Sequence, residues 1–89
     1  MSATQPVRMY STRLCPFCHM ARRLLTAKGV EWEEIGVDGN PELRAEMQAA
    51  SGRHTVPQIW VGDVHVGGFD DLAALERAGR LDPLLAGAA

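Results

Sequence analysis

Apolar residues along the first third of the chain follow two spacings, one extended and one helical. Residues 7–10 predict a strand, because this short run lies between a proline and a polar pair. From Pro16 to about Lys28 the spacing predicts a helix, with one apolar face made of Phe17, Met20, Ala21, Leu24 and Leu25. Gly29 follows as a left-handed cap, so the helix should end there.

A second strand and a second helix are predicted in the middle of the chain. Residues 30–37 alternate enough to form a strand with Val30, Trp32 and Ile35 facing inwards. Residues 40–52 follow with Asn as N-cap, Pro at the first helical position and Gly at the end. We expect this helix to bury Leu43, Met47 and Ala50.

The last third predicts a hairpin and one more helix. Residues 58–61 and 64–66 are two short strands joined by a tight Gly62-Asp63 turn. The helix that follows has acidic residues at its amino end and Gly79 as its stop, before a short amphipathic tail at residues 80–85. The order β-α-β-α-β-β-α predicts an α/β fold with one mixed four-stranded sheet and helices on its faces.

Length, composition and charge narrow the function classes. Eighty-nine residues predict a single domain over residues 1–89, and 46% hydrophobic with 22% charged residues is an ordinary globular composition. A net charge of -2 leaves no basic surface for nucleic acid. No apolar run reaches the roughly 18 residues of a membrane span, and the first residues lack the pattern of a secretion signal. We therefore expect a monomeric cytoplasmic protein that acts on a small or protein substrate.

Both cysteines lie at the start of the first predicted helix, where the backbone favours an anion. With the helix beginning at Pro16, Cys15 becomes the N-cap, and the free N–H groups of Phe17 and Cys18 point at its sulfur. Arg13 adds a positive charge two residues earlier. These features should lower the pKa of Cys15 from about 8.5 into the range of about 3.5 to 7.5.

The two thiols are predicted to have different surroundings. Cys18 falls on the flank of the apolar stripe and should be partly covered, whereas Cys15 should be exposed and activated. This asymmetry suits a nucleophile and a resolving cysteine. A structural disulfide would close too small a loop to constrain the unfolded chain, and cytoplasmic thiols are kept reduced. A structural zinc would need His19, His54 or His65 to join the cysteines, and these lack paired spacing. We expect no metal.

Three segments taken together resemble the glutaredoxins, small proteins with a thioredoxin fold. They are the Cys15-Pro16-Phe17-Cys18 helix start, the "TVP" of residues 55–57 and the "GGFDDL" of residues 67–72. The resemblance covers nearly the whole chain, from residue 7 to residue 85. It implies a glutathione-dependent thiol–disulfide oxidoreductase that reduces protein disulfides and glutathione mixed disulfides through a redox-active Cys15–Cys18 pair, with glutathione as co-substrate.

The resemblance also implies a glutathione site. Pro57 would be cis, so that the backbone of Val56 pairs with the cysteinyl part of glutathione like an added strand, flanked by Thr55. Asp70 and Asp71, after the Gly67-Gly68 turn, would hold the γ-glutamyl end. Arg44 would face the glycyl carboxylate. The expected glutathione-binding residues are Arg13, Phe17, Arg44, Thr55, Val56, Pro57, Gly68, Asp70 and Asp71.

Two positions depart from the family pattern, and two other functions stay open. Thr12 stands where many relatives carry lysine, and Phe17 replaces the usual tyrosine.

One alternative function is that of an electron donor reduced by a thioredoxin reductase, which would need no glutathione site. The other is a module in which two chains and two glutathiones hold an iron–sulfur cluster through Cys15. Relatives with that function usually have glycine where Pro16 stands.

Overall fold

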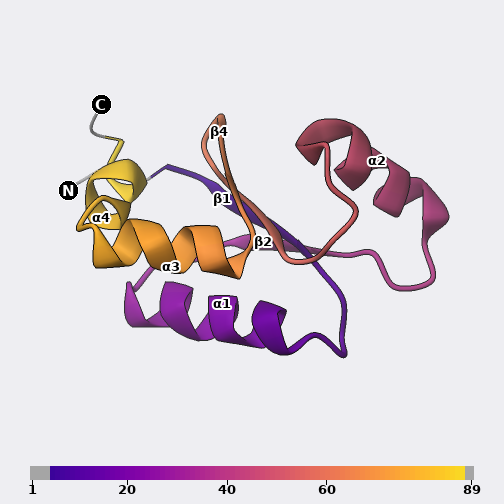
Figure 1. Ribbon diagram of the computed structural model, residues 1–89, viewed down its shortest axis with the longest axis horizontal. Helices are drawn as coiled ribbons and strands as arrows, with labels where there is room; N and C mark the ends of the chain where they lie inside the picture. The colour runs from indigo at the N-terminus through magenta and orange to yellow at the C-terminus, as the bar shows by residue number, and fades with distance from the viewer. Residues whose placement is uncertain (1–4, 88–89) are drawn as a thin grey trace.

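The computed structural model describes residues 5–87 and contains four strands and four helices within that range (Figure 1). The elements are β1 Val7–Ser11, α1 Pro16–Ala27, β2 Glu33–Gly36, α2 Pro41–Ser51, β3 Gln58–Val61, β4 Val64–Gly67, α3 Phe69–Arg77 and α4 Leu81–Leu85. The strand order is β2-β1-β3-β4. β1 is parallel to β2 and antiparallel to β3, and β3 is antiparallel to β4. The predicted order of elements and the mixed sheet are therefore confirmed.

One face of the sheet is covered by α1, α3 and α4, which lie together along it (Figure 1). Alternate residues of β1 and β3 point towards these helices, and the apolar faces of the helices pack against them. The fully buried cluster consists of Val7, Met9, Ala21, Leu25, Ile59, Val61, Leu72, Leu81 and Leu85. This core fixes the position of α1, the helix that carries both cysteines.

The opposite face of the sheet has a smaller core under α2. Tyr10, Val37, Met47 and Trp60 are buried there, and Leu43 packs against them. Ala50 is exposed, so the prediction that it is buried was wrong. The helix meets the sheet through Leu43 and Met47, and by Ala50 it has left the sheet surface.

β2 is shorter than the predicted strand, because the backbone N–H groups of Gly29 and Val30 form hydrogen bonds with the last turn of α1. Val30 donates to the carbonyl of Leu25 at 3.3 Å, and Gly29 donates to that of Thr26 at 2.9 Å. This pair of bonds requires a left-handed residue, and Gly29 has φ +71°. β2 consequently begins at Glu33, although Val30 and Trp32 still pack, half-buried, against the larger core.

The buried face of α1 is rotated relative to the one predicted. Cys18, Ala21 and Leu25 are fully buried, whereas Phe17 and Met20 are 59% and 44% exposed. At the amino end of α1, Phe17 stacks on Phe69 of α3 and Met20 is exposed, so neither residue enters the core. Cys18 was expected to be partly covered, and it is completely covered.

The two ends of the described chain meet at the carboxyl end of α1. Gln5 donates from its backbone to the carbonyl of Leu85 at 2.8 Å. Lys28, which caps α1, lies 2.6 Å from a carboxylate oxygen of Glu76 and 2.9 Å from one of Asp82. The tail predicted at residues 80–85 therefore contains a short helix, α4. The ion pairs of Lys28 join α1 to α4 through Asp82 and to α3 through Glu76. No helix within residues 5–87 is long and apolar enough to cross a membrane.

Candidate functional site around Cys15

The two cysteines lie at the first turn of α1, joined as a disulfide, with their Cα atoms 5.2 Å apart. Cys15 is the N-cap, and its sulfur accepts a hydrogen bond from the Cys18 backbone N–H at 3.1 Å. Pro16 takes the next position, where a missing N–H costs nothing. The predicted capping role of Cys15 is confirmed.

The two sulfurs differ in access. The Cys15 side chain is half-buried at the end of the helix, whereas Cys18 has no solvent exposure. An incoming thiol or disulfide can therefore reach Cys15 first. Thiol–disulfide exchange proceeds by attack of one thiolate on an accessible sulfur, so the pair is arranged for sequential chemistry.

A loop that precedes β3 brings backbone up to the Cys15 sulfur. The Val56–Pro57 peptide bond is cis, as the resemblance implied. The carbonyl oxygen of Val56 lies 3.8 Å from the Cys15 sulfur. A peptide-like ligand on Cys15 would thus lie beside the backbone of Val56, whose polar groups can pair with the backbone of the ligand.

The amino end of α3 forms the next part of the site. The Asp71 carboxylate accepts from the Gly68 backbone N–H at 3.0 Å and from Arg53 Nη1 at 3.0 Å. The Arg53 guanidinium, with the Gly68 amide, lowers the pKa of Asp71 below its ordinary value. Asp70, one residue earlier, is exposed in the same first turn. This turn presents free N–H groups and carboxylates side by side, which suits an amino acid end with both charges.

The glycines of this turn are needed for its close contacts. Gly67 has φ +113°, and a Cβ there would collide with the Asp71 carboxylate. An ideal Cβ at Gly68 would lie 3.6 Å from the Pro57 carbonyl oxygen. The start of α3 is therefore packed directly against the loop that approaches Cys15.

Arg44 of α2 contacts the loop that precedes β3. Its Nη1 donates to the carbonyl of His54 at 3.5 Å, which ties α2 to the residue before Thr55. Thr55 is exposed, and its carbonyl and hydroxyl both accept from the buried Gln58 side chain. The structure thus brings Arg44, Thr55, Val56 and Pro57 together along one loop.

Two predicted residues flank the site from the α1 side. Phe17 stacks against Phe69 of α3, with ring centroids 6.5 Å apart. Arg13 is held by its backbone N–H, which donates to both carboxylate oxygens of Asp38 at 3.1 and 3.2 Å. The Arg13 side chain is exposed, and no contact of its guanidinium joins it to the rest of the site among the described residues.

Within residues 5–87, no group of three or more histidine, cysteine or acidic side chains is placed to hold a metal ion. His19 and His54 are exposed, and His65 is hydrogen-bonded to Gln58. Trp60 is a buried residue of β3, and Trp32, which directly precedes β2, is half-buried.

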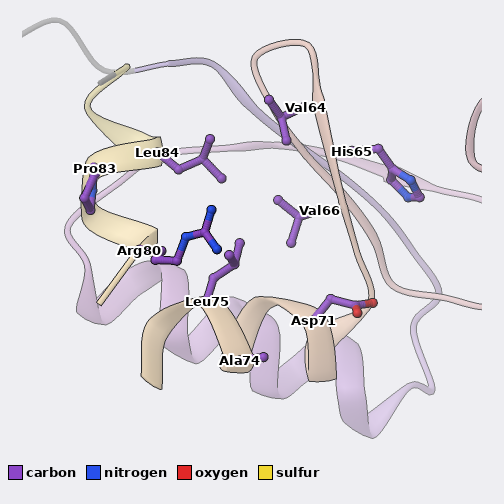
Figure 2. A pocket seen from close by; sticks show the side chains of 9 residues that line it. All are labelled: Val64, His65, Val66, Asp71, Ala74, Leu75, Arg80, Pro83 and Leu84. Carbon is purple, nitrogen blue, oxygen red and sulfur yellow. The ribbon is translucent and has the colours of Figure 1, made fainter. Parts of the chain in front are cut away.

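A separate hollow lies between β4, α3 and α4 (Figure 2). Its lining is mostly apolar and includes Val66, Leu75 and Leu84. Asp71 is the one predicted site residue among those that line it, and neither cysteine takes part. The chemistry of Cys15 therefore takes place outside this hollow.

Four residues around the site were missed in the sequence. Arg53 pairs with Asp71, Phe69 stacks on Phe17, and Gln58 and His65 support Thr55. The contacts of Arg53, Phe69 and His65 join residues 7 to 52 positions apart in the chain, which no local spacing indicates, whereas Gln58 and Thr55 are three positions apart. Only Phe69 gave a signal, as the aromatic residue directly after the glycine pair.

Comparisons with known proteins agree with this geometry. The family model described as glutaredoxin matches residues 7–66. A protein named glutaredoxin from Pseudomonas aeruginosa is 60% identical over 80 residues, which cover 90% of this chain and 95% of the relative.

Solved structures give the same result. The solution structure of glutaredoxin from Brucella melitensis superposes with a TM-score of 0.83 at 54% identity, covering 93% of this chain and 90% of that one. A buckwheat glutaredoxin–glutathione complex superposes with a TM-score of 0.84 at 28% identity, covering 94% and 81%. These neighbours confirm the thioredoxin fold.

Proposed function

This chain belongs to the glutaredoxin family and is a thiol–disulfide oxidoreductase, and we propose that glutathione is the thiol that drives it. The observation that carries the proposal is the Val56 carbonyl oxygen 3.8 Å from the Cys15 sulfur. That spacing leaves a peptide-like thiol on Cys15 beside backbone able to pair with it. The buckwheat neighbour, which is a complex with glutathione, supports the same ligand.

The proposed binding mode uses the three parts of the site for the three residues of glutathione. The backbone of Val56, flanked by Thr55 and Pro57, pairs with the central cysteinyl residue. The Gly68 turn with Asp70 and Asp71 holds the γ-glutamyl end, where the Asp71 carboxylate meets the ammonium. Arg44 and Arg13 supply positive charge for the glycyl carboxylate, and Phe17 covers the cysteinyl sulfur.

The proposed reaction with a glutathione mixed disulfide has two exchanges at Cys15. The Cys15 thiolate attacks the glutathionyl sulfur, the mixed disulfide bond breaks, and the substrate leaves as a thiolate. A glutathione thiolate then attacks the glutathione sulfur bound to Cys15, which releases glutathione disulfide and restores the Cys15 thiolate. One glutathione is consumed in this cycle, and the other half of the glutathione disulfide is the glutathionyl group that the substrate brought.

Protein disulfides follow a second route that needs Cys18. Cys15 attacks one substrate sulfur and forms a mixed disulfide, and Cys18 then attacks Cys15 to release the fully reduced substrate. The Cys15–Cys18 disulfide is afterwards reduced by two glutathiones. The complete burial of Cys18 supports this order, because a covered thiol can meet only the sulfur of its neighbour.

The test is turnover of a glutathionylated peptide by reduced glutathione, with the wild type, Cys15→Ser and Cys18→Ser. We expect the wild type and Cys18→Ser to be active and Cys15→Ser to be inactive. Reduction of a protein disulfide should require both cysteines. Turnover by Cys15→Ser would refute the assigned roles, and a wild type that works with a thioredoxin reductase and not with glutathione would refute the donor.

The comparisons favour neither alternative function. The reductase-fed electron donor would be revealed by that second outcome. The cluster-binding module would be revealed by a visible absorption band after anaerobic reconstitution with iron and sulfide. We place the protein in the cytoplasm as a monomer, where a reducing glutathione pool can sustain the cycle.

A further inference from the structure

A hydrogen-bonded chain of three side chains runs from the outer strand of the sheet to the loop beside Cys15. His65 Nε2 lies 2.7 Å from Gln58 Oε1. Gln58 Nε2 lies 3.1 Å from the Thr55 carbonyl oxygen and 3.3 Å from its hydroxyl. The Gln58 side chain is completely buried, and within residues 5–87 it shares that polar, buried state with Ser11 alone.

The direction of every hydrogen bond in this chain can be deduced. The Thr55 carbonyl can only accept, so the Gln58 atom facing it must be the amide nitrogen. Gln58 Oε1 therefore faces His65, and because Oε1 can only accept, the hydrogen must lie on His65 Nε2. The Thr55 hydroxyl accepts from the same amide, which leaves its own hydrogen free to be donated outwards.

The surroundings of His65 favour its neutral form, which can donate to Gln58 when its one hydrogen lies on Nε2. Burial, with the nearby Arg53 charge, lowers the pKa of His65, and Asp71 opposes that change more weakly. The ring also stacks on Trp60 at 4.6 Å between centroids. Figure 2 shows the His65 ring on the other side of β4 from Val64 and Val66, at the edge of the hollow that all three residues line.

We propose that His65 and Gln58 are positioning residues for the reaction, because they orient Thr55 and the backbone of Val56 against the ligand on Cys15. This inference rests on the proposed function, in which that loop binds glutathione. Gln58 follows the cis Val56–Pro57 bond directly, so its anchored amide fixes the loop from inside the sheet. The oriented Thr55 hydroxyl then donates to an acceptor on the glutathione moiety.

His65 on β4 would therefore affect glutathione binding without contacting glutathione. His65 touches neither cysteine, yet its Nε2 hydrogen holds the Oε1 end of the Gln58 amide while the Thr55 carbonyl holds the other end. Loss of that hydrogen leaves the buried Oε1 without its donor, and the amide that anchors the loop keeps one attachment in place of two. Because the loop binds the glutathionyl group both before and during sulfur exchange, the loss should raise KM and leave kcat nearly unchanged.

The experiment compares His65→Phe, His65→Gln and Val64→Thr in turnover of a glutathionylated peptide. His65→Phe keeps a ring against Trp60 and removes the donor, and we expect KM to rise about 3- to 10-fold, the usual effect of one neutral hydrogen bond. His65→Gln restores an N–H donor and should return KM to within about twofold of wild type. Val64→Thr, on the exposed side of the same strand, serves as the matched control.

A wild-type KM in His65→Phe would overturn the inference. An equal rise in His65→Gln and His65→Phe would also overturn it, because the ring and not the donor would then matter. Nitrogen-15 NMR of the wild type gives a test that needs no variant, since the hydrogen must be found on His65 Nε2, and its presence on Nδ1 would refute the chain. A wild type without glutathione turnover would refute the proposed function instead, and the NMR result would still decide the direction of the bonds.

Discussion

Glu34 on the edge strand β2 is the acceptor for three other side chains, and its ionised form should stabilise the fold. Its carboxylate accepts from Arg22 Nε at 2.8 Å, from Ser11 Oγ at 2.8 Å and from Trp32 Nε1 at 3.0 Å. Arg22 lies on α1 and Ser11 on β1. This one carboxylate therefore ties the helix of the active site to two strands.

The size of the effect follows from the pKa of Glu34. The Arg22 guanidinium, with Trp32 and Ser11, holds that pKa at about 2, against an ordinary value of 4.5. Such a difference corresponds to about 3 kcal/mol of stability at neutral pH when fully retained. Because the Glu34 side chain is 31% exposed, we expect solvent screening to leave about 1.5 kcal/mol.

Glu34→Gln should lower the free energy of unfolding at pH 7 by about 1.5 kcal/mol, or the melting temperature by about 6 to 12 °C. A carboxyl with a depressed pKa stabilises the fold above its unfolded pKa and loses that effect as the pH falls through its folded pKa. The difference between wild type and variant should thus be complete above pH 4.5 and mostly lost at about pH 2. Urea unfolding at both pH values measures it.

The neighbouring exposed carboxylate provides the control. Glu33→Gln removes the same charge from the same strand, at a side chain without a hydrogen bond among the described residues, and should change stability by less than about 0.5 kcal/mol. A Glu34→Gln loss that is equal at the two pH values would show that the ionised carboxylate is not the cause. A loss no larger than that of Glu33→Gln would show that the three contacts add nothing.

Three further predictions concern Gly67 before α3 and Asp71 in the first turn of α3. Asp71→Asn should raise KM for a glutathionylated peptide about 10-fold, the cost of one charged hydrogen bond, with kcat preserved; an unchanged KM in steady-state kinetics would contradict contact with the ammonium. The same variant should lose stability only above pH 3.8, because Arg53 and the Gly68 amide lower the pKa of Asp71. Gly67→Ala should destabilise the fold by more than about 1 kcal/mol in a thermal melt, since φ is +113° and the new Cβ meets the Asp71 carboxylate; an unaltered melt would mean that the turn relaxes freely.

Features set by neighbouring residues could be predicted from the sequence. The N-caps Cys15 and Asn40, each followed by proline, depend on one turn of backbone, and both are found where expected. The Gly62-Asp63 hairpin between β3 and β4 is local in the same sense. The family motifs added the cis bond before Pro57, which no local spacing reveals.

Features set by how the helices meet the sheet could not be predicted. The helical spacing of α1 placed Phe17 in the core and Cys18 at its margin, whereas the packed helix buries Cys18 and leaves Phe17 mostly exposed. The spacing fixes which residues share a face, but the way the helix is set against the sheet decides which of them are covered. The Arg53–Asp71 and His65–Gln58 contacts depend on the same three-dimensional placement.

The hydrogen bond between Gln5 and Leu85 has a practical consequence for protein engineering. The described ends of the chain meet beside the capping residue Lys28, at the far end of α1 from Cys15 (Figure 1). A short linker between them would give a circular chain that can be reopened at an exposed turn such as Gly39. Affinity tags, fluorescent reporters or a second redox module fused before residue 5 or after residue 87 would likewise leave the approach to Cys15 clear.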